Sequence, residues 1–220
     1  MRHKAAAVGL TLAMLFLVAG DSSGRIPRPS VTEEDWQLEF EFKALEPIQL
    51  EVAGEHRTYW YLRYTVINRT GADRPFTPDF TLYSERGELH QAGFQVPHQA
   101  YEIIRKRHND PLLRTPVGMM GKLLQGEDNA KHGIAIWPDF DAESGFVDIF
   151  VGGLSGEVQE IPLPKPIKKT LRLPDGKTKE ITKRTLILSK TLNLRFKIAG
   201  EVAARHRAEP ELVFGKWVMR

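Results

Sequence analysis

The 220-residue sequence contains no cysteine. This absence excludes disulfide bonds, thiol catalysis and thiolate metal sites. Covalent cross-links are not needed for stability, because about 200 residues suffice for a sandwich-sized domain with its own core. If the protein is exported, the lack of disulfides points to a bacterial envelope rather than to an animal secretory pathway.

Only one long apolar run is present, and it lies at the start of the chain. Cationic Arg2 and Lys4 precede apolar and small residues from Ala5 to Gly20, the pattern of a signal peptide. A helix over this run would reach roughly 24 Å, short of the ~30 Å hydrocarbon core of a bilayer. We therefore expect a removable signal peptide at 1–20, with a retained signal anchor as the alternative.

The residues after this run favour release of the protein from the membrane. Cleavage is expected after Gly20, with Gly24 as the alternative, and residues 21–34 are predicted to form a disordered linker. Asp21 occupies the position at which a bacterial lipoprotein needs its cysteine, so lipid anchoring is excluded. The expected location is periplasmic or extracellular, with no transmembrane span after signal removal.

Charge is distributed unevenly along the chain. Residues 1–160 hold 16 Lys or Arg against 23 Asp or Glu, whereas residues 161–220 hold 15 against 5. One interpretation is attraction of the basic part to an anionic surface, lipid headgroup or polyanion. The other is that cations cover the solvent faces of edge strands and block aggregation there, which the alternation with apolar residues favours. The candidate contact residues in this part are Lys168, Lys169, Lys183 and Arg184.

Strand patterns dominate the sequence after residue 35. Apolar and polar residues alternate over 36–43, and within 58–68 Trp60 and Leu62 share one face while Tyr59 and Tyr61 share the other. The run 146–151 is almost wholly apolar, which predicts a strand covered on both faces. Further strands are expected at 48–52, 80–83, 134–137, 169–173, 178–182, 192–198 and 212–219.

Two segments interrupt this strand pattern. Ala100, Ile103 and Ile104 lie at helical spacing between Pro97 and Pro111, which predicts a short helix in a connection at about 94–125. Prolines at 162, 164 and 166 predict a stiff extended connector and a boundary.

The run Lys122 to Trp137 contains Gly126-Glu127 and then Gly133 before an apolar strand. This arrangement resembles immunoglobulin-like sandwich domains of exported bacterial proteins, and the likeness covers about residues 36–156. The resemblance implies a binding or accessory module at most, and a fold alone does not fix an activity. The expected architecture is all-β: an immunoglobulin-like antiparallel β-sandwich at 35–160, the short helical insertion, and a basic β-rich C-terminal extension at 161–220.

Three patterns raise the question of catalysis or metal binding. Gly153 to Glu157 approaches a nucleophile elbow around Ser155, but its last glycine is replaced and prolines follow instead of a helix. Asp139 and Asp141 lie in an acidic loop of the kind that wraps calcium, although an EF-hand glycine is missing. Histidines near the helical connection are candidate copper or zinc ligands, namely His90, His98 and His108.

Aromatic residues supply one more candidate surface. Tyr59 and Tyr61 would form a sugar-stacking face if they were exposed, whereas such residues more often lie under a second layer or a helix.

Together these patterns predict a non-catalytic binding or interaction module of the cell envelope. Its expected partner is an envelope protein, a glycan or an anionic surface, with no nucleic acid and no cofactor. The alternative is a metal-binding or metal-dependent protein that uses the acidic loop or the histidines, and the second alternative is a hydrolase.

Overall fold

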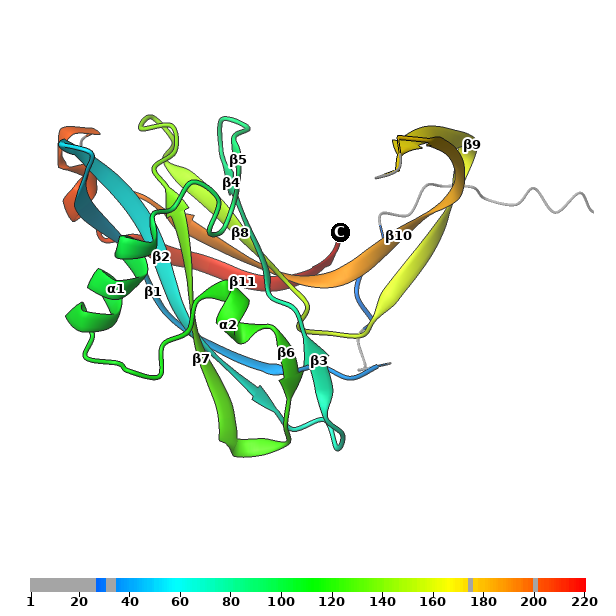
Figure 1. Ribbon diagram of the computed structural model, residues 1–220, viewed down its shortest axis with the longest axis horizontal. Helices are drawn as coiled ribbons and strands as arrows, with labels where there is room; N and C mark the ends of the chain where they lie inside the picture. The colour runs from blue at the N-terminus through cyan, green and yellow to red at the C-terminus, as the bar shows by residue number, and fades with distance from the viewer. Residues whose placement is uncertain (1–26, 31–34, 174–175, 200–201) are drawn as a thin grey trace, which may run out of the picture.

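The computed structural model describes residues 27–30, 35–173, 176–199 and 202–220 (Figure 1). The expected signal peptide at 1–20, and the parts of the expected linker at 21–26 and 31–34, lie outside the described residues. The elements in chain order are β1 (Glu39–Val52), β2 (Glu55–Asn68), β3 (Arg74–Phe76), β4 (Asp79–Ser84), β5 (Leu89–Gln91), α1 (His98–Arg107), α2 (Pro116–Met119), β6 (Gly121–Leu123), β7 (Gly126–Pro138), β8 (Phe146–Gly152), β9 (Val158–Arg172), β10 (Thr178–Lys197), η1 (Val202–Arg207) and β11 (Glu211–Met219).

Two antiparallel sheets pack face to face. The smaller sheet has the order β1-β2-β7, and the larger has the order β11-β10-β8-β4-β5, with β9 paired to β10. Strands β3 and β6 form a separate two-stranded ribbon. The expected all-β sandwich is confirmed.

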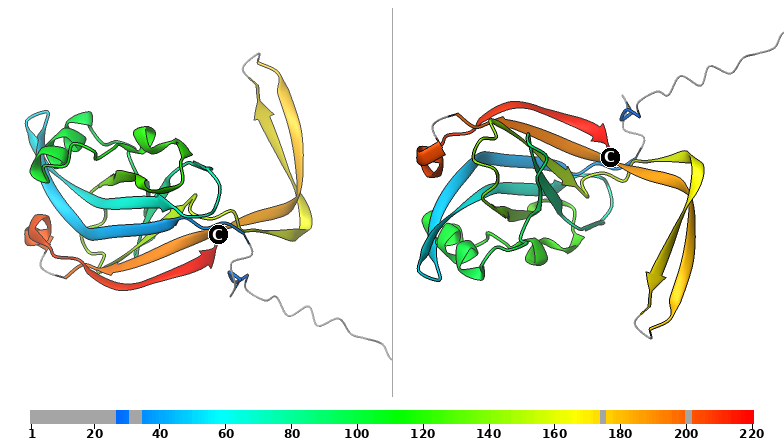
Figure 2. Two further views of the ribbon diagram at one scale, coloured as in Figure 1. Left: turned by 90° about the horizontal axis from the view of Figure 1, so that it is seen from below. Right: turned by 90° about the horizontal axis from the view of Figure 1, so that it is seen from above.

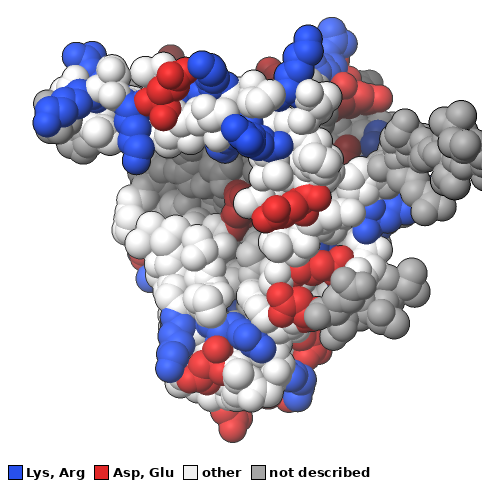
Figure 3. Space-filling view, turned by 90° about the vertical axis from the view of Figure 1, so that its right-hand side faces the viewer, with Lys and Arg blue, Asp and Glu red and all other residues white. Residues whose placement is uncertain are grey.

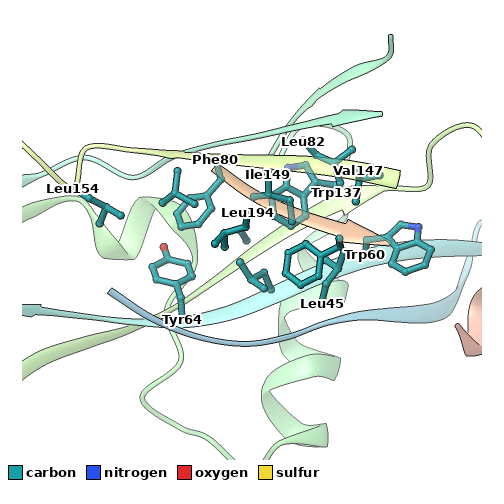
Figure 4. Close-up of a cluster of buried hydrophobic side chains, with 14 of the residues drawn as sticks. Leu45, Trp60, Tyr64, Phe80, Leu82, Trp137, Val147, Ile149, Leu154 and Leu194 are labelled. Atoms are coloured by element: carbon teal, nitrogen blue, oxygen red, sulfur yellow. The ribbon is translucent and has the colours of Figure 1, made fainter. Parts of the chain in front are cut away.

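The core lies between the two sheets. Trp60 and Tyr64 point into it from the smaller sheet, and Leu82, Ile149 and Leu194 from the larger one, all of them buried (Figure 4). Leu62 of β2 belongs to the same buried cluster. This arrangement follows from the period-two pattern, because alternate side chains of a strand point to the same face. Each such side chain stabilises the fold by about 1.5–3 kcal/mol when it leaves water.

An irregularity in β1 changes which residues face the core. Strand β1 pairs Phe42 with Tyr64 and then Leu45 with Leu62, so β1 carries one more residue than β2 between these pairs. An extra residue reverses the alternation of faces. Even-numbered Phe40 therefore packs on the sandwich core, whereas even-numbered residues after the bulge, such as Ile48, face the opposite side of the sheet.

Helix α1 covers that opposite side of the smaller sheet. Ala100 and Ile104 of α1 are fully buried in a second cluster with residues of β1, β2 and β7. The helix follows Pro97, whose extended backbone precedes the first turn, and cations in its last turn face the negative end of its dipole. The short helix expected in the connection is confirmed.

Two expectations about the second half of the chain are wrong. In strand β8 the residues of one face are buried, whereas Phe146, Asp148 and Phe150 on the other face are only partly buried. Residues 161–220 are not an appended extension either, since β10 pairs with β8 and β11 pairs with β10 in the larger sheet. A boundary at residue 160 would cut through one sheet.

Candidate functional site

A two-stranded arm projects from the sandwich (Figures 1 and 2). The arm comprises residues 158–189: strand β9 and the part of β10 that precedes Lys190. None of its described residues is buried, on either face. An isolated two-stranded hairpin is marginally stable in water, so an arm of this length without a covering layer is a candidate contact surface.

The arm bends where its prolines lie. Lys183 pairs with Ile167, but Thr185 pairs with Pro162. Residues 163–166 are therefore opposed by Arg184 alone, and the prolines in this stretch have no N–H to donate to the ladder. Figure 2 shows the arm turning sharply. The prolines thus lie within β9, where they shape the arm, and do not separate two domains.

Beyond the bend, the two faces of the arm differ in chemistry. Directly paired residues share a face, and three successive pairs each combine one apolar side chain with one lysine. We call this the lysine–apolar face, formed by Ile167 with Lys183, Lys169 with Ile181, and Leu171 with Lys179. The other face, here the polar face, carries no apolar side chain and consists of Lys168, Thr170, Arg172, Thr178, Glu180 and Thr182.

The arm is strongly cationic. Residues 158–189 hold eight Lys or Arg against three Asp or Glu. One acidic group is locally paired, since Glu180 lies 3.4 Å from Lys168 Nζ. Figure 3 shows Lys and Arg projecting along the top of the molecule, above a hollowed part of its surface that carries few charges. The candidate contact residues Lys168, Lys169, Lys183 and Arg184 thus lie on an element that projects from the rest of the molecule.

A buried ion pair holds the base of the arm. Lys190 Nζ lies 2.9 Å from Glu157 Oε2, with side chains 6% and 9% exposed. Burial opposes the charged form of Glu157, but hydrogen bonds from the Ser30 N–H and from Lys190 outweigh it, so the pKa of this carboxyl lies below its ordinary value. The Lys190 ammonium also lies 5.4 Å from the ring centroid of Trp217 in β11. The arm is therefore fixed to the sandwich at its root.

The structure places the four predicted cations on this arm, although not on one face. Lys169 and Lys183 belong to the lysine–apolar face and Lys168 to the polar face, while Arg184 lies opposite the proline stretch at the bend. Their sequence positions could not show this, because the faces depend on the pairing of β9 with β10.

Tyr59 and Tyr61 do not form a sugar-stacking face. Their exposed fractions are 3% and 0%, and both pack beneath α1. A sugar-stacking face needs exposed rings, and these two rings are buried because helix α1 covers this side of the smaller sheet.

The acidic loop is occupied by internal contacts. Asp139 Oδ1 accepts hydrogen bonds from Trp60 Nε1 at 2.7 Å and Arg205 Nε at 3.1 Å. Asp141 Oδ2 lies 2.8 Å from Arg86 Nε, and its Oδ1 accepts the Glu143 N–H. Both carboxylates therefore connect separate segments of the fold.

The histidines lie in separate places. His90 contacts Glu88 in the β4–β5 hairpin, His98 contacts Tyr101 within α1, and His108 follows α1. Across the described parts of the chain, no group of three or more His, Asp or Glu side chains is arranged to hold a metal ion. Neither the histidines nor the acidic loop therefore supplies such a group among the described residues.

Ser155 has a structural environment. Its Oγ donates to the Trp36 carbonyl at 3.2 Å and accepts the Glu157 N–H at 3.2 Å. Gly153 adopts φ +82° against the backbone of Thr77, so the turn is tight, but it leads into β9 and not into a helix. The hydroxyl fastens the turn to the segment before β1.

One polar cluster was missed by sequence reasoning. The Tyr61 hydroxyl donates to Glu46 Oε2 at 2.8 Å and lies 2.9 Å from His108 Nε2. Burial, reinforced by Glu46, raises the pKa of Tyr61, and burial followed by the Arg63 charge lowers the pKa of His108. A fully buried phenol with a raised pKa is a poor nucleophile, so the cluster fastens the end of α1 to the sheet. No sequence signal marks it, since its members are 15 and 47 residues apart from Tyr61.

Comparison with known proteins gives no relative: no family model, no curated protein and no solved structure matches this chain. The resemblance to immunoglobulin-like domains accordingly stays an expectation. Within the described residues, no helix has both the length and the apolar character needed to cross a membrane.

Proposed function

We propose that this protein is an exported, non-catalytic binding module of the cell envelope, and that the arm is the element with which it contacts an anionic partner. The observation that carries the proposal is the arm itself: a two-stranded projection, open on both faces, with eight Lys or Arg against three Asp or Glu. Export is supported by the signal-peptide pattern of residues 1–20.

The alternatives in the chain are weaker because their side chains are engaged elsewhere. Ser155 is hydrogen-bonded to the Trp36 carbonyl and Asp139 to Arg205 of η1. His108, after α1, lies within hydrogen-bond distance of the Tyr61 hydroxyl. Within the described part of the chain, Lys168 pairs with Glu180 of the arm itself, and neither Lys169 nor Lys183 makes an ion pair with the sandwich. Charge attraction over about 10 Å at moderate salt would draw an anionic partner toward the arm first.

The test compares two variants of equal charge change. In the chain from residue 21 onward, K168Q/K169Q/K183Q/R184Q removes four of the eight cations of the arm. The control K43Q/R57Q/K106Q/K122Q removes four exposed cations outside the arm. Binding to anionic phospholipid vesicles and to soluble polyphosphate is measured at low and high salt. We expect the arm variant to bind at least one probe about tenfold more weakly or worse, because each cation near an anionic surface contributes about 1 kcal/mol.

The control variant should keep its affinity. Equal losses in both variants would show that net charge alone drives binding and would overturn the role of the arm. Failure of the unsubstituted chain to bind either probe would overturn the proposal as a whole.

A further inference from the structure

The lysine–apolar face of the arm points to a particular anionic partner. We propose that this face docks on the surface of an anionic lipid bilayer, with its apolar side chains entering the headgroup region and its lysines contacting lipid phosphates. This inference rests on the proposed function and names the partner class for the same element.

The pairing of β9 with β10 creates the required pattern. Each of three successive pairs sets an apolar residue beside a lysine, and the apolar residue changes strand from one pair to the next. Side chains of directly paired residues lie about 4.5–5.5 Å apart, so every apolar group has a cation as its neighbour. Lysine stems can lie along apolar surface while their ammonium groups extend to the headgroups, which suits the boundary between hydrocarbon and phosphate.

The contrast between the faces argues for a bilayer over a soluble polyanion. A polyanion rewards cations and gains nothing from exposed aliphatic groups, yet Ile167 on this face is 55% exposed and Leu171 is 37% exposed. The polar face has cations as well, but it has no apolar side chain. Segments that lie in a membrane interface have this division into an apolar face with cations and a polar face.

A second copy of the chain fits the face less well. Two such faces in contact would bring lysines against lysines, and like charges placed opposite each other are destabilising. The prolines of β9 also interrupt the outer edge along which another strand would pair.

The end of the arm continues the pattern. Leu173 is 38% exposed, and its N–H donates to the carbonyl of Lys177 at 2.8 Å across the hairpin. Gly176 adopts φ +82°, which closes the turn without a Cβ clash. An apolar residue and a lysine therefore face each other at the last described pair as well, and the ion pair at the root holds the opposite end of the arm to the sandwich.

The absence of native cysteine allows a direct test. Single variants Ile181→Cys and Thr182→Cys place a fluorophore sensitive to polarity on adjacent residues of β10 that lie on opposite faces. Each labelled protein, from residue 21 onward, is mixed with vesicles of pure phosphatidylcholine, with vesicles containing phosphatidylglycerol, and with polyphosphate. We expect a blue shift and a rise in emission for the label at 181 with phosphatidylglycerol vesicles only, and a much smaller change for the label at 182.

Vesicle affinity is measured in parallel on unlabelled variants. I167T/L171T/I181T removes apolar groups while keeping side chains that favour strands, and T170S/T178S/T182S is the matched change on the polar face. The first should bind phosphatidylglycerol vesicles about tenfold more weakly or worse, given about 0.8 kcal/mol for each buried methylene, with unchanged affinity for polyphosphate. The second should bind vesicles like the parent.

Other outcomes separate this inference from the proposed function. One outcome would overturn the bilayer inference and leave a soluble polyanion as partner. In that outcome, binding depends on the arm cations, the labels at 181 and 182 give equal signals, and I167T/L171T/I181T and T170S/T178S/T182S bind vesicles equally well. A dimer in size-exclusion chromatography that dissociates in I167T/L171T/I181T would overturn it in favour of a second copy. If the unsubstituted chain bound neither anionic vesicles nor polyphosphate, both the bilayer inference and the proposed function would be overturned.

Discussion

Arg205 of η1 lies against the ring of Phe140, 4.3 Å from its centroid, while its Nε donates to Asp139 Oδ1 at 3.1 Å. The same carboxylate oxygen accepts the indole N–H of Trp60. Arg205 is only 7% exposed, so a cation is buried between aromatic rings and one carboxylate. Asp139 thus joins the smaller sheet to the segment between β10 and β11.

Replacing Asp139 should therefore weaken the fold. Asp139→Ala leaves a buried arginine and a buried indole N–H without this acceptor, at a cost of about 1–3 kcal/mol in the free energy of unfolding. Urea unfolding monitored by tryptophan fluorescence measures the change. As a control, Asp141→Ala removes a partly exposed pairing with Arg86 and an exposed hydrogen bond from the Glu143 N–H, and should cost about 1 kcal/mol. If Asp139→Ala were as stable as the parent but no longer bound anionic vesicles or polyphosphate, the structural role would be contradicted and Asp139 would again be a candidate contact residue.

The Lys190–Glu157 pair should make stability depend on pH. The pKa of Glu157 is lower in the folded protein than its unfolded value of about 4.3. A depressed carboxyl pKa stabilises the folded state above the unfolded pKa, and this contribution is lost as pH falls through the folded pKa. We expect Glu157→Gln to unfold about 2–4 kcal/mol more easily at pH 7, because it leaves the buried lysine charge without its partner.

Unfolding in urea at several pH values checks this expectation. The difference between parent and Glu157→Gln should start to shrink as pH falls below the unfolded pKa of about 4.3, because the unfolded carboxyl then binds a proton that the folded one does not. It should be lost once pH lies below the folded pKa of Glu157. The double variant Glu157→Gln with Lys190→Met should recover part of the lost stability, because no unpaired charge stays buried. A difference that is constant from pH 7 to about pH 3 would show that the ion pair is not the cause.

The regular parts of the fold could be predicted from sequence because burial in a strand leaves a period of two. Trp60 and Leu62 face the core and Tyr59 and Tyr61 face α1, as the alternation in β2 predicts. The bulge between Phe42 and Leu45 left no such mark, since an extra residue changes pairing without changing composition. The length of β10 was missed for a similar reason: its first half is exposed and its second half buried, so the pattern changes within one strand.

For the candidate site, the sequence predicts the excess of cations but not their arrangement on the arm. The excess of cations after residue 160 is visible in the sequence, and Lys168, Lys169, Lys183 and Arg184 do lie on the arm. Their division between two faces depends on register, which the sequence alone did not fix. The burial of Tyr59 and Tyr61 depends on where α1 packs, a long-range contact that alternation within β2 cannot reveal.

A close approach between two strands predicts a sensitive glycine. Gly133 in β7 pairs with Tyr64 in β2, and the tyrosine ring lies across the space that a Cβ at position 133 would occupy. Gly133→Ala should force the buried ring of Tyr64 to move and should cost about 1–3 kcal/mol, the usual range for overpacking. Thermal unfolding measures the loss. Gly133→Ala combined with Tyr64→Leu should lose less than the sum of the single variants, since the two residues share one space.

The prolines of the arm should protect it from self-association. Strand β9 forms the outer edge of a ribbon with no covering layer, and such edges pair with other chains unless charge, bulges or prolines prevent it. P164V/P166V supplies backbone N–H groups and strand-forming side chains at the bend. We expect this variant to form larger species that grow with protein concentration in light scattering, while P27V, a proline outside the arm, stays like the parent. A P164V/P166V protein that remains as dispersed as the parent would show that the lysines alone keep the arm apart.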